Sequence, residues 1–457
     1  MFDNKPQRRT FLKTAGVAGA VALAGCAGSS SGGSGATENE SSGSGTTESE
    51  SSGSESNGAT TGSGGTGSST EITWLHDRDA GKETINEMID EYNDQNPNVK
   101  VKAQLTPSGT GTAEELQKMR AAGDPPEILW FTFGQAYRFA REGVLAPLND
   151  VVEENGLRTF SDREDSFMAT SIVGPVTWHY RTDLYDNPET FKDYLQQAKR
   201  IDEEEDITPL QIPNGETTLA DSLAVQLLWN GGVNIWDGPS DDIKFSMASG
   251  NNRERAIQTY EWIQNAYQYA SNGNGLAWGD AATAYQEGSA ASVPYISMWI
   301  PTLYLAEKPD LRENTANGFH PIAKNAQNDR KFAWFEGNML WDTENKDLAR
   351  DFLMWFHAEE QQRRFISSNA GDYIPPTKEG MSADWYRSND AVHEGMIEMF
   401  TNEAENFTPP VATGTDGELN YPAVSNGLIF SQALARLLHD GESPSGTVDW
   451  LQSNLEM

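Results

Sequence analysis

Apolar and polar positions follow two different periods at the start of the folded part of the chain. A run at 71–75 predicts a β-strand, and the next segment, 81–92, repeats its apolar side chains at the spacing of one helix face. Pro97 ends this helix, and apolar and polar residues then alternate over 99–103 as in a second strand. The order strand, helix, strand predicts an α/β layer. The apolar positions of the helix are Ile85, Met88, Ile89 and Tyr92.

The same alternation of elements continues along the chain. Helical spacing recurs at 113–122, a Gly-Asp-Pro-Pro sequence breaks it, an apolar strand is expected at 127–133, and helical spacing returns at 135–142. Further helices are expected at 191–201, 219–228, 253–270, 348–365 and 428–438, and further strands at 171–180, 290–295 and 338–342. The fold class expected is therefore α/β.

A charged and then apolar leader precedes this folded part. Arg8 and Arg9, followed by an apolar stretch, resemble a twin-arginine export signal, and Leu-Ala-Gly-Cys at 23–26 resembles a lipoprotein processing box. We expect 1–25 to be the signal and Cys26, the only cysteine, to be the lipid attachment point. The rest of 26–70 is rich in Ser, Gly and Thr and cannot bury enough apolar surface to fold, so it is expected to be a disordered tether.

This leader sets the expected location. A lipid on Cys26 would hold the protein to the membrane through its N-terminus, on the extracellular face of the cytoplasmic membrane. The alternative is a buried N-terminal helix with an incidental cysteine, but such a helix has no polar face and would need a partner.

Composition narrows the class of function. The formal charge is −35, with 68 Asp and Glu against 33 Lys and Arg, which disfavours nucleic acid as a partner. The acidity is spread along 71–457, as in proteins that stay hydrated in concentrated salt, so a halophilic source is expected. A stretch of this length also suggests two domains rather than one core.

Motifs for other chemistries are missing from the sequence. It has no P-loop, no His-Glu-x-x-His pattern and no Cys/His cluster, so neither ATP hydrolysis by this chain nor a zinc site has support. A calcium loop starting at Asp77 is also disfavoured, because Met88 stands where the closing glutamate should be. We therefore expect no metal and no cofactor.

Several stretches resemble one protein family. They include "AAGDPPEILWFTFGQAYRFAREGVLAPLNDVV", "YQEGSAASVPYISMW" and "DLARDFLMWFHAEEQQRRF". Their order is similar to that in the family 1 extracellular solute-binding proteins of ATP-driven ABC importers, the group that contains maltose-binding protein, and the leader resembles that of haloarchaeal-type lipoproteins. One departure is Tyr-Arg-Thr-Asp at 180–183, where many members carry Tyr-Asn-Lys-Asp, so the ligand class cannot be copied from any one member.

The resemblance implies a two-lobed fold like that of type II periplasmic binding proteins, with crossing hinge segments and a ligand cleft between the lobes. We expect 71–178 with 318–372 to form lobe 1 and 179–317 with 373–457 to form lobe 2. The implied function is capture of a small-molecule solute, above all a sugar or oligosaccharide, without catalysis. Its partners would be ABC permease and ATPase subunits on separate chains. The alternatives are a surface-anchored glycoside hydrolase, which also needs carboxylates, and a carbohydrate-binding adhesin.

A sugar site needs aromatic rings for stacking and polar side chains that donate and accept hydrogen bonds. The resemblance and the placement in loops and at strand ends give ten candidates. They are His76, Asp77, Arg78, Phe131, Gln135, Trp178, Trp236, Trp278, Trp299 and Glu336.

Each candidate also has a structural alternative. Residues 76–78 could form an ordinary solvated turn, and Glu336 could be the usual charge at a strand edge. One or two aromatic residues at 130–133 must face the core if the strand alternates, and at least one of Trp178 and Tyr180 is expected to pack in the core. Trp236 and Trp278 are placed in glycine-rich loops, where an exposed aromatic has no packing reason to be.

Overall fold

The structure is a computed structural model. It describes residues 69–107, 111–157, 165–237, 244–271, 276, 278–319, 321–324, 326, 330–409 and 428–455. The signal at 1–25, the lipid site at Cys26 and nearly all of the tether lie outside these residues. No helix in the described ranges is long and apolar enough to cross a membrane.

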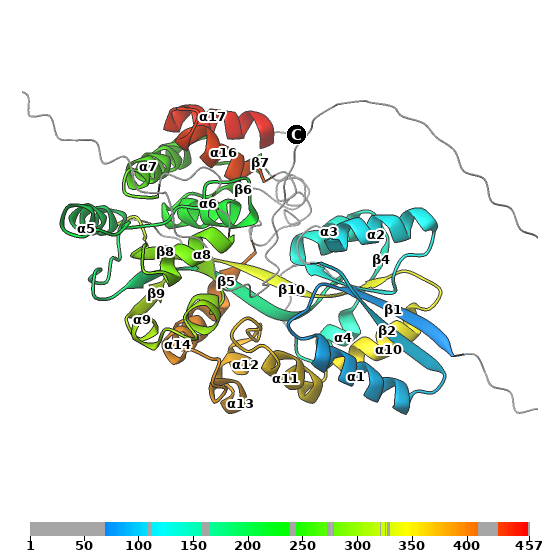
Figure 1. Ribbon diagram of the computed structural model, residues 1–457. Coiled ribbons are helices and arrows are strands. Elements are labelled where there is room, and N and C mark those ends of the chain that lie inside the picture. Colours follow the sequence, from blue (N-terminus) through cyan, green and yellow to red (C-terminus); the bar gives the residue numbers. More distant parts are fainter. Residues whose placement is uncertain are drawn as a thin grey trace, which may run out of the picture. The chain divides into compact units, whose positions relative to one another are not determined.

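One sheet organises the described part of the chain (Figure 1). Its strands are β1 (Thr70–His76), β2 (Val99–Leu105), β3 (Ile128–Thr132), β4 (Leu145–Ala146), β5 (Ala169–Arg181), β8 (Ser292–Ile296), β9 (Thr315–Gly318), β10 (Lys331–Trp341) and β11 (Phe407–Thr408). The main path runs β2-β1-β3-β10-β5-β8, and β4, β9 and β11 join it at the side. β1 pairs in parallel with β2 and β3, whereas β10 is antiparallel to β3 and β5.

Helices cover the sheet in two groups, and their alternation with strands confirms the predicted α/β class. The group that packs around β1, β2 and β3 consists of α1 (Lys82–Gln95), α2 (Gly111–Ala122), α3 (Phe133–Arg141), α4 (Asn149–Glu154), α10 (Lys346–Phe356) and α11 (Glu359–Ser367).

The second group lies toward β8 and β9 and includes a short hairpin. Its helices are α5 (Phe191–Glu204), α6 (Thr218–Asn230), α7 (Gly250–Tyr267), α8 (Trp278–Gln286), α9 (Pro309–Glu313), α12 (Lys378–Ser382), α13 (Asp384–Arg387), α14 (Glu394–Glu403), α16 (Ile429–Leu438) and α17 (Pro444–Leu455). It also holds a π-helix, η1 (Ile300–Tyr304), a 3₁₀ turn, η2 (Ala404–Asn406), and the hairpin of β6 (Trp236–Asp237) and β7 (Lys244–Phe245).

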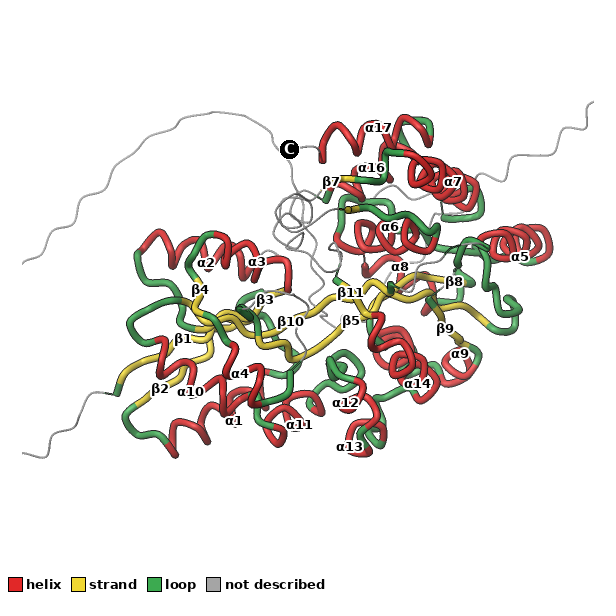
Figure 2. The backbone as a smooth tube through the Cα atoms, turned by 180° about the vertical axis from the view of Figure 1, so that it is seen from behind, coloured by secondary structure: helices red, strands yellow, loops and turns green. Residues whose placement is uncertain are grey.

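Two long strands connect these groups. The first part of β5 pairs with β10, and its second part, from Val176 onward, pairs with β8 and β9. β10 pairs with β3 through its later residues and with β11 through its first two. A third connection follows α11, where Ile374 forms a β-bridge with Val173 of β5. Figure 2 shows β5 and β10 running side by side between the two sets of helices.

Gly337 allows β5 and β10 to approach each other at this crossing. The pairing register between the two strands shifts between Glu336 and Gly337, as in a β-bulge. A Cβ atom at Gly337 would lie 2.1 Å from the backbone oxygen of Ala169. Only glycine therefore fits here without moving one of the two connecting strands.

The hydrophobic pattern predicted most elements near their observed positions. In α1, the buried residues are the four apolar positions that the helical spacing identified. The predicted single helix at 348–365 is wrong, because the chain forms α10 and α11 with a break at His357 and Ala358. His357 is buried there, and its Nε2 lies 3.2 Å from the amide of Asn338 on β10. The strand predicted at 338–342 is the last part of the longer β10.

A buried helix holds the first half of β10 on the side of β8. Nearly all residues of α6 are buried. The side-chain oxygen of Gln226 accepts a hydrogen bond of 2.6 Å from the backbone of Phe332, and its amide donates to Asn230. Asn230 donates in turn to the backbone oxygens of Phe319 and Pro321 at 2.9 Å. This network satisfies buried polar groups and fixes the position of the start of β10 against α6.

Candidate functional site

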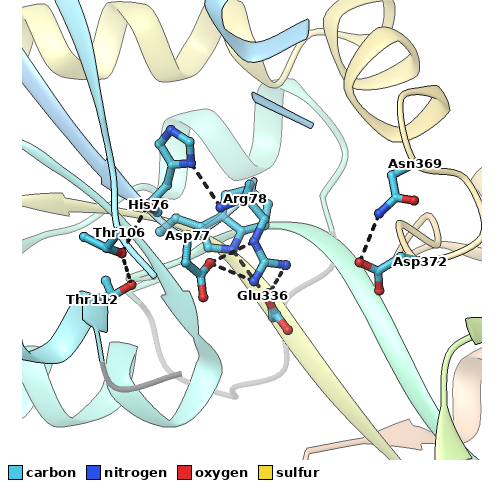
Figure 3. A network of polar contacts seen from close by, with 9 residues as sticks. His76, Asp77, Arg78, Thr106, Thr112, Glu336, Asn369 and Asp372 are labelled. Atoms are coloured by element: carbon cyan, nitrogen blue, oxygen red, sulfur yellow. Dashed lines mark hydrogen bonds and ion pairs between the residues drawn. The ribbon is translucent and has the colours of Figure 1, made fainter. Parts of the chain in front are cut away.

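The end of β1 places a cation next to carboxylates. Arg78 follows the strand, and its guanidinium lies 2.7 Å from Asp77 and 3.0 Å from Glu336 of β10 (Figure 3). It also lies over the ring of Trp130, 5.5 Å from the centroid. Carboxyl ends of parallel strands commonly form binding sites, because their loops gather at one edge of the sheet. This loop is therefore a candidate binding element rather than a solvated turn.

Strand alternation brings Glu336 to this group. Glu336 is paired with Thr132 of β3, and Trp130, two residues earlier, lies on the same face. The indole of Trp130 approaches the Glu336 carboxylate at 3.4 Å. Burial alone would lower the pKa of Arg78, but Glu336 and Asp77 raise it above its ordinary value, so the guanidinium stays charged. Its side chain is only 14% exposed, so this ion pair is largely removed from bulk solvent.

A third carboxylate comes from the connection after α11. Asp372 accepts a hydrogen bond of 3.2 Å from Asn369 on one oxygen and a short one from the indole of Trp299 on the other. Burial raises its pKa to about 6, although Arg78 lowers it. Its neighbour Tyr373 is buried and stacks on Phe365 of α11 at 4.8 Å, which fixes this part of the connection.

Irregular backbone positions Trp299. Ser297, directly after β8, has a φ of 49°, and its N–H donates to Pro175 of β5. Trp299 then precedes the π-helix η1. A Cβ at Gly371 would lie 2.5 Å from the hydroxyl of Thr302 in η1, so glycine permits this close packing. Single π-helical turns and left-handed non-glycine residues cluster at functional sites.

Aromatic side chains extend the site beyond Trp299. The ring of Tyr295 on β8 lies 6.0 Å from that of Trp299 and 5.2 Å from that of Trp278, the first residue of α8. The indole of Trp278 donates to the hydroxyl of Thr218 at 3.1 Å. Tyr295 is fully buried, whereas both tryptophans are half-buried.

This arrangement offers hydrogen-bond donors, acceptors and ring faces. One guanidinium stands among three carboxylates, which can accept from the hydroxyl groups of a ligand. The half-buried indoles can stack on an apolar ring face. Within the described residues, no group of three or more His, Cys, Asp or Glu is arranged to hold a metal ion.

The structure therefore brings five of the ten candidates close to this group: Asp77, Arg78, Glu336, Trp299 and, through Tyr295, Trp278. Phe131 is half-buried and pairs with Gly337, so it lies on the opposite face of the sheet from Glu336. Gln135 lies in the first turn of α3 and is half-buried. The expectation that one or two of the aromatic residues at 130–133 face the core is confirmed, because Trp130 and Phe133 are buried.

Three candidates lie in the interior instead. His76 is 1% exposed and packs on Trp74, and burial lowers its pKa to about 4, so the ring is neutral near pH 7. Trp178 is 1% exposed and packs edge-on against Tyr194. Trp236 was expected in an exposed loop, but it is buried in β6 against Phe245. Trp278 begins a helix rather than lying in a glycine-rich loop. The burial of His76, Trp178 and Trp236 corrects the expectation that each is free to contact a solute.

Asp372 and Asn369 were missed by the sequence reasoning. They lie in "SSNAGDYIPP", a polar and glycine-containing stretch after an amphipathic helix, which looks like an ordinary loop. Only the three-dimensional arrangement identifies them, since the third connection between the lobes must pass beside β5 and β10. Tyr295 was missed because its strand position predicts core packing.

Comparison with known proteins agrees with this description. A model of the family described as bacterial extracellular solute-binding protein matches residues 78–363, more than half of the chain, and a twin-arginine translocation signal model matches residues 5–25. A search among curated proteins finds no match.

Solved structures share the two-lobed fold at low sequence identity. The GacH receptor of Streptomyces glaucescens, solved without ligand and with acarbose, and maltose-bound MalE3 of T. maritima are each 15% identical. In both cases the match covers 85% of this chain and 99% of that chain, with a TM-score of 0.68. A cyclic α-maltosyl-1,6-maltose binding protein of Arthrobacter globiformis is 16% identical, covers 85% and 98%, and has a TM-score of 0.66. At this identity the likeness establishes the fold, whereas the family match over 78–363 establishes membership. The chain belongs to the bacterial extracellular solute-binding proteins.

Proposed function

We propose that this chain is the carbohydrate receptor of an ABC importer, held by a lipid on Cys26 to the extracellular face of the cytoplasmic membrane. It captures the sugar at the site formed by Arg78, Glu336, Asp372 and Trp299 and delivers it to permease and ATPase subunits on separate chains. The residues 71–178 with 318–372, and 179–317 with 373–457, would be the two lobes that close on the solute.

The observation that carries this proposal is the contact between Trp299 and Asp372 beside the Arg78 ion pairs. It joins a stacking surface to charged hydrogen-bond partners, which is what the apolar face and hydroxyl edge of a sugar require. Phe131 lies on the opposite face of the sheet from Glu336 and is not expected to contact this sugar. The structures with bound acarbose and maltose that share this fold support the same ligand class.

The site also indicates which sugars are excluded. Three carboxylates face a single guanidinium, so an anionic ligand would meet net negative charge in a partly desolvated place. Neutral sugars avoid this cost, because their hydroxyls donate to the carboxylates. We therefore expect neutral carbohydrates to bind and the phosphate esters of the same sugars to bind poorly.

A thermal-unfolding screen tests the proposal. The purified chain is heated in concentrated salt with mono- and oligosaccharides, polyols, sugar phosphates and small peptides, and a ligand that binds only the native state must raise the midpoint. A rise with neutral carbohydrates that is lost in Trp299→Ala supports the proposal. A rise only with peptides or sugar phosphates, or none with a folded sample, contradicts it.

Binding without catalysis needs its own test. A carboxyl group with a raised pKa, such as Asp372, is what a general acid of a glycoside hydrolase needs. Both Asp372 oxygens, however, already accept hydrogen bonds from Trp299 and Asn369. We expect no new reducing ends when oligosaccharides are incubated with the protein, and turnover above background would favour the hydrolase.

The membrane anchor is tested independently of the sugar. Replacing Cys26 with serine removes the sulfur to which the lipid would attach. In cells, we expect Cys26→Ser to move the protein from the membrane fraction to the medium without changing its sugar affinity. A variant that stays in the membrane fraction contradicts the lipid anchor but leaves the receptor function intact.

A further inference from the structure

The buried side chain of His76 contacts the backbone of Arg78. Its Nδ1 accepts a hydrogen bond of 3.2 Å from the backbone N–H of Arg78, whose guanidinium points toward Glu336 (Figure 3). A backbone N–H can only donate, so Nδ1 carries no proton and the neutral ring has its proton on Nε2. Burial lowers the pKa of this ring to about 4, which agrees with the neutral form.

The bond from His76 has the pattern of an Asx-turn. Asn or Asp often accepts through its side chain from the backbone N–H two residues on, and this bond fixes the turn that follows. Nδ1 of histidine and Oδ1 of asparagine are both bonded to Cγ, so histidine can take the same role. A carboxylate at this position would add a negative charge next to Asp77. A protonated imidazole would add a cation next to Arg78 and could no longer accept the bond.

The backbone of His76 is held to buried side chains. Its oxygen accepts hydrogen bonds of 2.8 Å from the N–H and 3.2 Å from the hydroxyl of Thr106, at the end of β2. That hydroxyl lies 2.7 Å from the hydroxyl of Thr112 in α2. The ring of His76 packs on Trp74, with 5.1 Å between the ring centroids. Because all four residues are buried, His76 is a fixed point from which the loop that carries Arg78 begins.

Arg78 depends on an accurately placed backbone, because its contacts come from different strands. Its guanidinium lies 3.0 Å from Glu336 of β10 and 5.5 Å from the ring centroid of Trp130 in β3. Neither of these residues moves with the loop after β1. A change in the backbone angles at 76–78 would therefore displace the guanidinium from Glu336 and from Trp130.

We propose that His76 is a positioning residue of the site. It sets the conformation of the turn that begins at 76, and through it the place of the Arg78 guanidinium, without contacting the solute. The inference rests on the proposed function only where it concerns solute binding. The competing role is packing alone, which would need the ring of His76 but not its Nδ1 atom.

Two substitutions separate these roles. His76→Asn keeps an acceptor bonded to Cγ and removes the ring that packs on Trp74. His76→Phe keeps a ring and removes the acceptor. A matched control is His179→Phe in β5, where the ring is fully buried and Nε2 lies 3.4 Å from the hydroxyl of Thr177.

The coupling between Arg78 and Glu336 gives a readout that needs no solute. A double-mutant cycle of Arg78→Met and Glu336→Gln is measured by urea unfolding in the parent and in each of the three histidine variants. We expect the coupling energy to fall to about half or less in His76→Phe, and to stay near the parent value in His76→Asn and His179→Phe. Packing alone would leave the coupling unchanged in His76→Phe.

The coupling energies decide the inference even if one variant is unstable. Coupling that persists in His76→Phe, or that is lost in His76→Asn, overturns the positioning role. If His76→Phe does not fold, His76→Asn decides, because retained coupling supports the role of the acceptor and lost coupling overturns it. Equal loss in the control variant His179→Phe would also overturn the inference, since the effect would then not depend on His76.

Solute binding tests the same residue in the proposed function. Calorimetric titrations in concentrated salt measure the affinity for maltose, cellobiose and xylobiose. For each sugar that the parent binds, His76→Phe should bind about three- to tenfold more weakly, because one hydrogen bond that places Arg78 is lost. His76→Asn and His179→Phe should bind like the parent. Equal affinity of His76→Phe and the parent overturns the role in binding. A folded parent that binds none of the three sugars counts against the proposed function, whereas the coupling energies still decide whether His76 positions Arg78.

Discussion

The Arg78 ion pairs give the most quantitative prediction. Replacing Arg78 with methionine keeps an apolar side chain of similar length but leaves Asp77 and Glu336 without their cation. These carboxylates are only 17% and 22% exposed, so water replaces the lost partner incompletely. Replacing Glu336 with glutamine in addition removes one of the uncompensated charges.

The structure sets the expected size of the effect. At 3.0 Å, the attraction between Arg78 and Glu336 is about 5 kcal/mol with an effective dielectric constant of 20, and desolvation offsets much of it. We expect Arg78→Met to lower the free energy of unfolding by about 3 kcal/mol, the lower end of the range for broken buried pairs. Adding Glu336→Gln should restore about 1 to 2 kcal/mol, and the coupling energy of the pair is this gain plus the cost of Glu336→Gln alone in the parent.

Urea unfolding of the four proteins of this double-mutant cycle, followed by tryptophan fluorescence, measures the coupling. A matched control is the exposed pair of Lys82 and Asp79, which are 2.8 Å apart with side chains 50% and 67% exposed. Lys82→Met should leave the free energy of unfolding nearly unchanged, because an exposed ion pair contributes little to stability. Additive costs for Arg78→Met and Glu336→Gln, or an Arg78→Met variant as stable as the parent, would refute this account of the site.

Three other predictions concern the framework and the charge. Gly337→Ala should destabilise the protein by about 3 kcal/mol or more, because its Cβ would lie 2.1 Å from a backbone oxygen of β5. The control is Gly279→Ala, whose Cβ would meet nothing within 4 Å. It should change the free energy of unfolding by less than about 1 kcal/mol. The raised pKa of Asp372, about 6, means that the native state holds its proton more tightly than the unfolded state, so ionisation above pH 6 costs stability. Asp372→Asn should therefore be more stable than the parent by about 1 to 2 kcal/mol at pH 7.5 in urea unfolding, with the difference closing as pH falls through 6 toward 4. If the net charge of −35 suits concentrated salt, the midpoint of thermal unfolding should rise steadily between dilute and molar KCl, and a midpoint independent of salt would contradict a halophilic source.

The elements that could be predicted from the sequence are those whose own pattern determines them. Helix α1 shows four apolar side chains at helical spacing, and all four are buried. The break between α10 and α11 could not be predicted, because His357 and Ala358 interrupt neither the apolar spacing nor the helix propensity of 348–365. It is the tertiary contact of His357 with Asn338 that stabilises the break.

The candidate site divides in the same way. Arg78 and Glu336 could be proposed because each lies at the end or edge of a predicted strand. Their pairing could not be deduced, since it depends on β10 lying between β3 and β5. Trp178 and Trp236 show the converse, because a tryptophan in a strand or glycine-rich loop gives no sign of whether its ring faces a ligand or the core. Asp372 could not be proposed, because it lies in the connection after α11 and the sequence does not reveal the path of that connection.

Hydrogen–deuterium exchange of the purified chain, with and without a saturating carbohydrate that raises its unfolding midpoint, tests the central claim most directly. We predict slower exchange in peptides that cover 76–78, 297–304 and 369–373, because the solute should hold these three segments together, and no change in α17. Unchanged exchange in all three segments while the sugar is bound, or protection confined to other parts of the protein, would contradict the placement of the site.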